Sequence, residues 1–169
     1  MPKPDANTYP PYFNTYIKLV VEEDIMEALT NQRKYAGTFF HSIPKEKYDY
    51  KYADGKWSIK ELLQHIIDTE RVFNYRALAF SRRDDHILPS FDEKDYTANA
   101  HGSARKWDDL VDEFIAVRRS TELLFNSFSQ EQLNFPGKAS DYEMSANAMG
   151  FTIAGHLAHH IKIIRERYL

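Results

Sequence analysis

The chain has 169 residues, a length typical of one folded domain, and residues 1–169 are read as a single domain with an irregular N-terminal arm at residues 1–12. Its 22 basic and 25 acidic residues give a formal charge of −3, so nothing in the charge favours a nucleic acid or an anionic membrane as a partner. The absence of cysteine excludes disulfides, thiolate catalysis and cysteine-ligated metal sites. No membrane-spanning run or signal peptide is recognised, so a cytoplasmic protein is expected.

The N-terminal part of the chain predicts one helix followed by a loop. Apolar residues keep helical spacing between residues 15 and 42, and the segment ends before Pro44. Gly37 and a β-branched cluster at residues 17–21 weaken this pattern, because both lower helix propensity. Residues 45–56 carry turn signals and are expected to form a loop that lies across the bundle.

The second predicted helix has the clearest start signal. Ser58 and Glu61 have the spacing of a capping box, and an apolar stripe extends from Leu62 to about residue 83. The polar residues 84–102 then form a long connection, close to the longest that a compact domain usually carries without structure of its own. This connection is therefore expected to be functional or partly structured.

Two further helices complete the pattern. One begins near Ser103 and carries a sustained apolar stripe to Phe128, a short turn follows at residues 129–133, and the last helix begins near Ser145 and continues to the C-terminus. No segment has the alternation typical of a strand. The sequence therefore predicts an all-α fold, a four-helix bundle with a long loop between its second and third helices.

Three of the seven histidines lie close together in the last predicted helix. His156 and His160 are one turn apart, so their imidazoles project from the same face and can chelate one metal ion, whereas His159 points toward a flank. His65, at the edge of the apolar stripe of the second helix, is the best candidate for a third ligand. Such a pair also arises by chance, and an inward-facing histidine is more often part of a core, so spacing alone leaves both interpretations open.

The two histidine motifs together resemble those of a known family. The segment KWSIKELLQHIIDTE at residues 56–70 precedes GHLAHHI at residues 155–161, and this pairing resembles the DinB/YfiT-like superfamily. The resemblance extends over nearly the whole chain and implies a four-helix bundle that binds a divalent metal, usually zinc or nickel. The family's ligands are one histidine on the second helix and an HxxxH pair on the last, which match His65, His156 and His160.

The resemblance leaves the reaction open. Some members look like thiol S-transferases that use bacillithiol, mycothiol or glutathione, and others resemble metal-dependent hydrolases. A metal held by three neutral imidazoles keeps its full charge and would lower the pKa of a bound water or of a substrate thiol. We therefore expect a metal-dependent enzyme acting on a small molecule, with a low-molecular-weight thiol as co-substrate if it is a transferase. The alternative is a non-catalytic protein with a structural or vestigial metal site.

Other polar residues have two interpretations each. Arg76 lies on the flank of His65 and either holds an anionic group of the substrate or pairs with a surface acid. Asp68 and Glu70 are interpreted as solvated acids, with support of an imidazole N–H as the alternative. The acids of the long connection either border the mouth of a pocket or are simply solvated: Asp92, Glu93 and Asp95.

The aromatic residues bear on assembly. Trp107 and Phe114 are assigned to the core rather than to a binding site. A symmetric homodimer is expected, because two-fold dimers are the commonest soluble oligomers and many members of the superfamily look like homodimers. The candidates for its interface are Phe114, Phe125 and Phe128, and the alternative is that these side chains fill the core of one chain.

Overall fold

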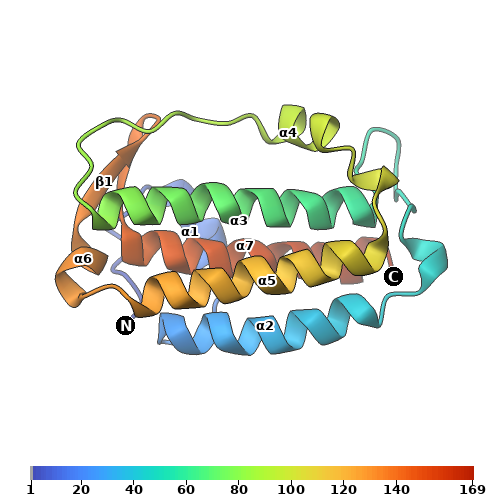
Figure 1. Cartoon of the computed structure of the whole chain (residues 1–169), viewed down its shortest axis with the longest axis horizontal. Coiled ribbons are helices and arrows are strands. Elements are labelled where there is room, and N and C mark those ends of the chain that lie inside the picture. Colours follow the sequence, from blue (N-terminus) through green and yellow to red (C-terminus); the bar gives the residue numbers. More distant parts are fainter. Residues whose placement is uncertain (1) are drawn as a thin grey trace.

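The computed structural model describes residues 2–169, and four long helices lie side by side in it (Figure 1). These helices are α2 (Ile25–His41), α3 (Ile59–Ser81), α5 (Trp107–Asn126) and α7 (Ala146–Arg167). The shorter elements are α1 (Asn14–Ile17), α4 (Glu93–Ala100), α6 (Gln130–Asn134), and the antiparallel strands β1 (Pro136–Ala139) and β2 (Tyr142–Ser145). The predicted four-helix bundle is confirmed. No helix within residues 2–169 combines the length and apolar character needed to cross a membrane.

The order of the helices explains the long connection after α3. α2 and α3 each pack mainly against α5 and α7, so these two consecutive helices face each other across the bundle. α3 and α5 are neighbours that run in the same direction (Figure 1). The chain must therefore return along the length of α3, whose 23 residues span about 34 Å, before α5 can begin. The returning segment is not structureless, because it contains α4, which packs on α3.

The start of α3 agrees with the sequence prediction. The Ser58 hydroxyl accepts a hydrogen bond from the backbone N–H of Glu61, and the Glu61 carboxylate accepts one from the backbone N–H of Ser58. Both bonds satisfy backbone donors that a helix start leaves without partners. At the start of α7, the Ser145 hydroxyl accepts a hydrogen bond from the backbone N–H of Ala148, without a reciprocal side-chain bond. The third long helix starts later than predicted, at Trp107, after a single 3₁₀ turn at Gly102–Ala104.

The first predicted helix, residues 15–42, is wrong in its extent. α1 ends at Ile17, and α2 begins only at Ile25. The Asp24 carboxylate accepts hydrogen bonds from the backbone N–H groups of Met26 and Glu27, so it starts a new helix at this point. The β-branched residues before it disfavour helix and leave the chain in an irregular connection.

The expectation that the chain has no strand is also wrong. β1 and β2 form a hairpin in which Pro136 is paired with Ser145 and Ala139 with Tyr142. The turn between them includes Ser140, whose φ is +55°. Strands of four residues are too short to show a recognisable alternation. The Pro136-Gly137 pair lies in β1 and packs against α3: a Cβ at Gly137 would stand only 1.9 Å from the Phe80 ring.

Two apolar clusters fill the bundle, one toward each end. The first contains Leu29, Phe80 and Phe125, and the second contains Phe40 and Phe114. Phe114 and Phe125 are completely buried and Phe128 is 8% exposed. These three side chains therefore fill the core of one chain, which is the alternative to a place in a dimer interface. Trp107, which the sequence placed in the core, is buried as predicted.

A polar layer separates the two clusters. In three of the four long helices, the residues of this layer lie between those of one cluster and those of the other: Gln32 on α2, Glu70 on α3, Arg118 and Thr121 on α5. Arg118 donates to both carboxylate oxygens of Glu70 at 2.8 Å and to the amide oxygen of Gln32 at 2.9 Å. The Thr121 hydroxyl donates to Glu70 at 2.6 Å. Glu70 is thus a buried partner of Arg118, and its interpretation as a solvated acid is wrong.

Candidate metal centre

Three histidines meet where α3 packs against α7, beside the polar layer. The Nε2 atom of His156 lies 3.1 Å from that of His65 and 3.0 Å from that of His160. The three side chains are buried, with 4 to 8% of their surface exposed. Their nitrogens form a group in which one ion could be held. The three residues that the sequence singled out are therefore brought together, and we call them the histidine triad.

His159 does not belong to the triad. Its ring packs edge-on against the Tyr16 ring at a centroid distance of 5.5 Å, and the residue is partly exposed to solvent. The remaining histidines lie elsewhere, and two of them have partners of their own: His41 Nδ1 contacts the carbonyl oxygen of Gly37, and His86 Nδ1 contacts the carboxylate of Asp84.

The spacing of the triad nitrogens fits one small cation. Two imidazole nitrogens that bind the same zinc-like ion at about 2.0–2.1 Å stand roughly 3.0–3.4 Å apart. The observed separations of 3.0 and 3.1 Å fall in this range. Unprotonated nitrogens that face one another this closely repel through their lone pairs, and a shared cation removes that repulsion. The donor set, three imidazoles and no carboxylate, suits a divalent transition-metal ion.

Burial keeps the imidazoles neutral, as metal binding requires. The pKa of His65 is lowered to about 4, first because the ring is buried and then because His159 is near. Burial also lowers the pKa of His156 and of His160 well below the ordinary value, and the neighbouring imidazoles act in the same direction. At neutral pH all three rings therefore offer a lone pair rather than a charge.

Hydrogen bonding fixes the orientation of one ring of the triad. His65 Nδ1 lies 3.4 Å from the Thr69 hydroxyl, one turn along α3. In the tautomer that carries its proton on Nδ1, His65 donates to this hydroxyl and leaves Nε2 free to face His156. The Nδ1 atom of His160 is buried and has no hydrogen-bond partner among the residues that the structure describes.

The triad is covered by aromatic side chains from short elements. The Trp57 ring lies 4.8 Å from the His65 ring, and the Tyr16 ring of α1 lies 5.5 Å from the His156 ring. α1 approaches α7 this closely because residue 155 is glycine: a Cβ there would stand 2.2 Å from the carbonyl oxygen of Tyr16. These rings exclude bulk water from two sides of the triad.

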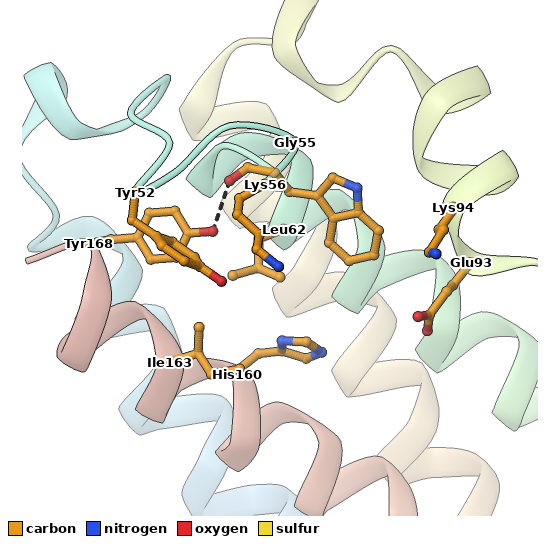
Figure 2. Close-up of a pocket in the computed structure, with 10 residues that line it drawn as sticks. Tyr52, Gly55, Lys56, Leu62, Glu93, Lys94, His160, Ile163 and Tyr168 are labelled. Carbon is orange, nitrogen blue, oxygen red and sulfur yellow. Dashed lines mark hydrogen bonds between the residues drawn. The ribbon is translucent and has the colours of Figure 1, made fainter.

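Two pockets reach the triad from different directions. The first, of about 440 Å³, is open to His160 and has walls of Trp57 and Tyr168, joined by a hydrogen bond of 2.8 Å from the tyrosine hydroxyl to the tryptophan carbonyl oxygen (Figure 2). The second, of about 230 Å³, is open to His156. Glu93 lines both, and it is the only acidic residue that lines either of them in the described part of the chain. Figure 2 shows Glu93 on α4, across the opening from His160.

The acids of the long connection have different positions. Glu93 borders the pockets, as one of the two interpretations had it. Asp92 instead caps α4 by accepting hydrogen bonds from the backbone N–H groups of Lys94 and Asp95. Asp68 does not belong to this connection but to α3. It is half-buried there and accepts a hydrogen bond from the Gln64 amide.

Among residues 2–169, Arg76 has no acidic side chain as a partner. Its guanidinium is buried and donates to the Tyr142 hydroxyl at 2.7 Å and to the carbonyl oxygen of Pro89 at 2.8 Å. It lines the second pocket together with His156. Tyr142 and Tyr16 also line this pocket, and sequence reasoning missed both. Tyr142 lies in the hairpin that was not predicted, and Tyr16 carries no local signal of its place beside α7.

Comparisons with known proteins identify the family and agree with the fold. The sequence matches the model of the DinB superfamily over residues 28–164, and the chain belongs to this superfamily. The structure is similar to that of YfiT from Bacillus subtilis, described as "a probable metal-dependent hydrolase with an unusual four-helix bundle topology". The TM-score is 0.64 at 15% sequence identity, and the match covers 96% of this chain and 91% of YfiT. A search of curated proteins finds no match.

Proposed function

We propose that this protein is a metal-dependent hydrolase of a small molecule, and that His65, His156 and His160 bind the metal. The observation that carries the proposal is the buried triad of neutral imidazoles with a pocket open to it. Membership of the DinB superfamily and the structural likeness to YfiT support it. Zinc and nickel are the metals proposed, because imidazole nitrogen is a favourable ligand for both.

The triad leaves room for a substrate. Within residues 2–169, no further side chain of the metal-ligating types joins the group of three. Catalytic metal sites typically have three protein ligands and an open position, whereas structural sites are closed by four. This difference favours an enzyme over a protein with a structural metal. A divalent ion bound here would supply Lewis acidity and lower the pKa of a water or thiol beside it.

The residues around the triad have distinct roles in this proposal. Glu93 can accept a proton from a nucleophile that enters either pocket, because its carboxylate borders both. Trp57 and Tyr16 cover two of the imidazoles and keep bulk water away from them. The low dielectric constant that results strengthens the electrostatic interactions of the site.

Thiol transfer is the second candidate reaction, and one observation favours it. The two pockets reach the triad from different sides, through His160 and through His156. Such an arrangement can seat a low-molecular-weight thiol in one pocket and an electrophile in the other. A hydrolase needs only one of these pockets for its organic substrate.

Metal analysis combined with an activity screen tests the proposal. Protein purified without immobilised metal or chelator is expected to hold about one zinc or nickel ion per chain, and His160→Ala is expected to lose it. His159→Ala is the matched control and should retain the metal, because this ring lies outside the triad. Esterase, amidase and thiol-transfer substrates are then compared with holo, stripped and reloaded protein. A wild-type chain that takes up neither metal at micromolar concentration would contradict the proposal.

A further inference from the structure

Arg76 is a buried cation for which the described part of the chain supplies no carboxylate partner. Its side chain is 5% exposed, and its two hydrogen bonds go to neutral oxygens of Tyr142 and Pro89. No salt bridge to it is found among residues 2–169. Burying a charge is costly unless an opposite charge or strong hydrogen bonds compensate it. A group that supplies negative charge at this position would therefore be bound favourably.

The contrast with Arg118 shows how the same fold treats a structural arginine. Arg118 is fully buried, and its guanidinium donates to both oxygens of Glu70 at 2.8 Å. The charge is thus neutralised inside the polar layer and is not available to a ligand. Arg76 is also buried, with 5% of its surface exposed, but it lines a pocket and has no carboxylate beside it among residues 2–169. Two of the five N–H donors of its guanidinium make hydrogen bonds within the chain, to Tyr142 and to Pro89.

The pocket connects Arg76 with the triad. The Phe73 ring separates them: its centroid lies 5.8 Å from the Arg76 Cζ atom and 6.2 Å from the centroid of the His156 ring. Phe91 and Tyr142 also hold their rings near the guanidinium, at 5.7 and 5.8 Å. One small molecule with an apolar body along Phe73 can therefore reach the guanidinium at one end and His156 at the other.

We propose that this pocket binds a small carboxylate with an apolar or aromatic body, whose carboxylate group contacts Arg76. A planar guanidinium and a carboxylate match in geometry, which makes this the strongest common pair of charged hydrogen-bonding groups. Among the described residues, the pocket is lined by one permanently charged cation, Arg76, and one acidic residue, Glu93. This balance favours a monoanion over a phosphate dianion, which would meet Glu93 with a second charge. The size of the pocket, about 230 Å³, limits the ligand to a small molecule.

The inference deepens the proposed function, on which it rests for the claim that this ligand is a substrate. The binding itself needs only the pocket. Binding is therefore measured in the metal-free protein, where a carboxylate has no metal to coordinate. Failure of metal binding or of catalysis would overturn the proposed function and leave this binding measurement intact. Failure of phenylacetate binding would overturn the carboxylate pocket and leave the proposed metal-dependent function intact.

The experiment uses titration calorimetry and NMR with phenylacetate, phenylacetamide and phenyl phosphate as probes. Wild-type protein is expected to bind phenylacetate at least about tenfold more tightly than the neutral amide, a difference of about 1.4 kcal/mol. Arg76→Gln should remove this preference, and Arg76→Lys should keep part of it because it retains the charge without the planar fork. Arg82→Gln is the matched control: it removes one positive charge just beyond the end of α3, from an exposed residue outside the pocket.

Each outcome decides the proposal. Equal affinities for phenylacetate and phenylacetamide in the wild type, tighter binding of phenyl phosphate, or no binding at millimolar concentration would overturn it. Unchanged selectivity in a folded Arg76→Gln variant would do the same. If neither Arg76 variant folds, nuclear Overhauser contacts between the phenyl protons of the bound ligand and the Phe73 ring of the wild type decide, and their absence refutes the assigned pocket.

Discussion

Acidification of the metal-free protein is a direct test of the buried triad. In the folded chain the pKa of His65 is about 4, because its ring is buried, whereas the ordinary value is 6.5. Below pH 6.5 the unfolded chain takes up a proton that the folded chain does not, so the free energy of unfolding falls. The contribution of His65 is therefore fully present above its unfolded pKa and is lost as the pH falls toward the folded value.

The magnitude follows from the two pKa values of His65. Their difference corresponds to roughly 3 kcal/mol when the loss is complete, of which about 2 kcal/mol is lost between about pH 7.5 and about pH 5. His156 and His160 act with the same sign, because burial lowers the pKa of each. The stripped protein should therefore lose more stability over this range than His65 alone accounts for.

Urea unfolding of the chelator-stripped protein, followed by circular dichroism at a series of pH values, measures this loss. His65→Asn is expected to flatten the dependence of stability on pH. His86→Asn is the control: the hydrogen bond to Asp84 raises the pKa of His86, so its contribution is present at low pH and lost as the pH rises. Its removal cannot flatten the curve. A wild-type stability that is constant from about pH 7.5 to about pH 5, or an equal loss in His65→Asn, would refute the reasoning.

Three further predictions concern packing and assembly. Gly155→Ala places a methyl group against the carbonyl oxygen of Tyr16 and should lower the free energy of unfolding, measured with urea, by about 1–3 kcal/mol. Gly37→Ala is the control and should not lower it, because a methyl group there meets only ordinary van der Waals contacts. Equal effects of the two substitutions would contradict this reasoning. Glu70→Gln leaves the Arg118 guanidinium buried without its carboxylate and should cost about 3–5 kcal/mol, and a loss below about 1 kcal/mol would show that the pair is replaceable. We propose a homodimer in solution, so light scattering at micromolar concentration should give twice the chain mass of 19.8 kDa, and a mass of one chain that does not change on concentration would exclude it.

The long helices and the triad could be predicted because their signals are local. The capping pair of Ser58 and Glu61 marks the start of α3 within a few residues of sequence. His156 and His160 are one turn apart, and the helical wheel places His65 on an inward edge. The helical period and the chemistry of neighbouring residues are enough to select these three histidines as candidates. The resemblance to the DinB/YfiT-like superfamily is needed to favour a shared metal over histidines of an ordinary core.

The rest could not be predicted because it depends on packing between distant segments. Glu70 and Arg118 are 48 residues apart, and nothing near either residue distinguishes a buried ion pair from two solvated charges. Arg76 meets Tyr142 only because a hairpin of four-residue strands turns back against the end of α3. Such short strands carry no periodic signal, so the sequence provides no reason to bring that tyrosine to the pocket.

The polar layer has a consequence for the way in which the four helices find their alignment. A slip of α5 by one turn, about 5.4 Å, would carry the Arg118 guanidinium away from Glu70 and into one of the apolar clusters. An uncompensated charge there costs several kcal/mol, a penalty that a bundle of uniformly apolar helices would not impose on misaligned packing. The layer connects all four helices, since the Gln32 amide also donates to the carbonyl oxygen of Ala154 on α7. The same interactions that reject wrong alignments therefore also set the height of His65 on α3 against His156 on α7.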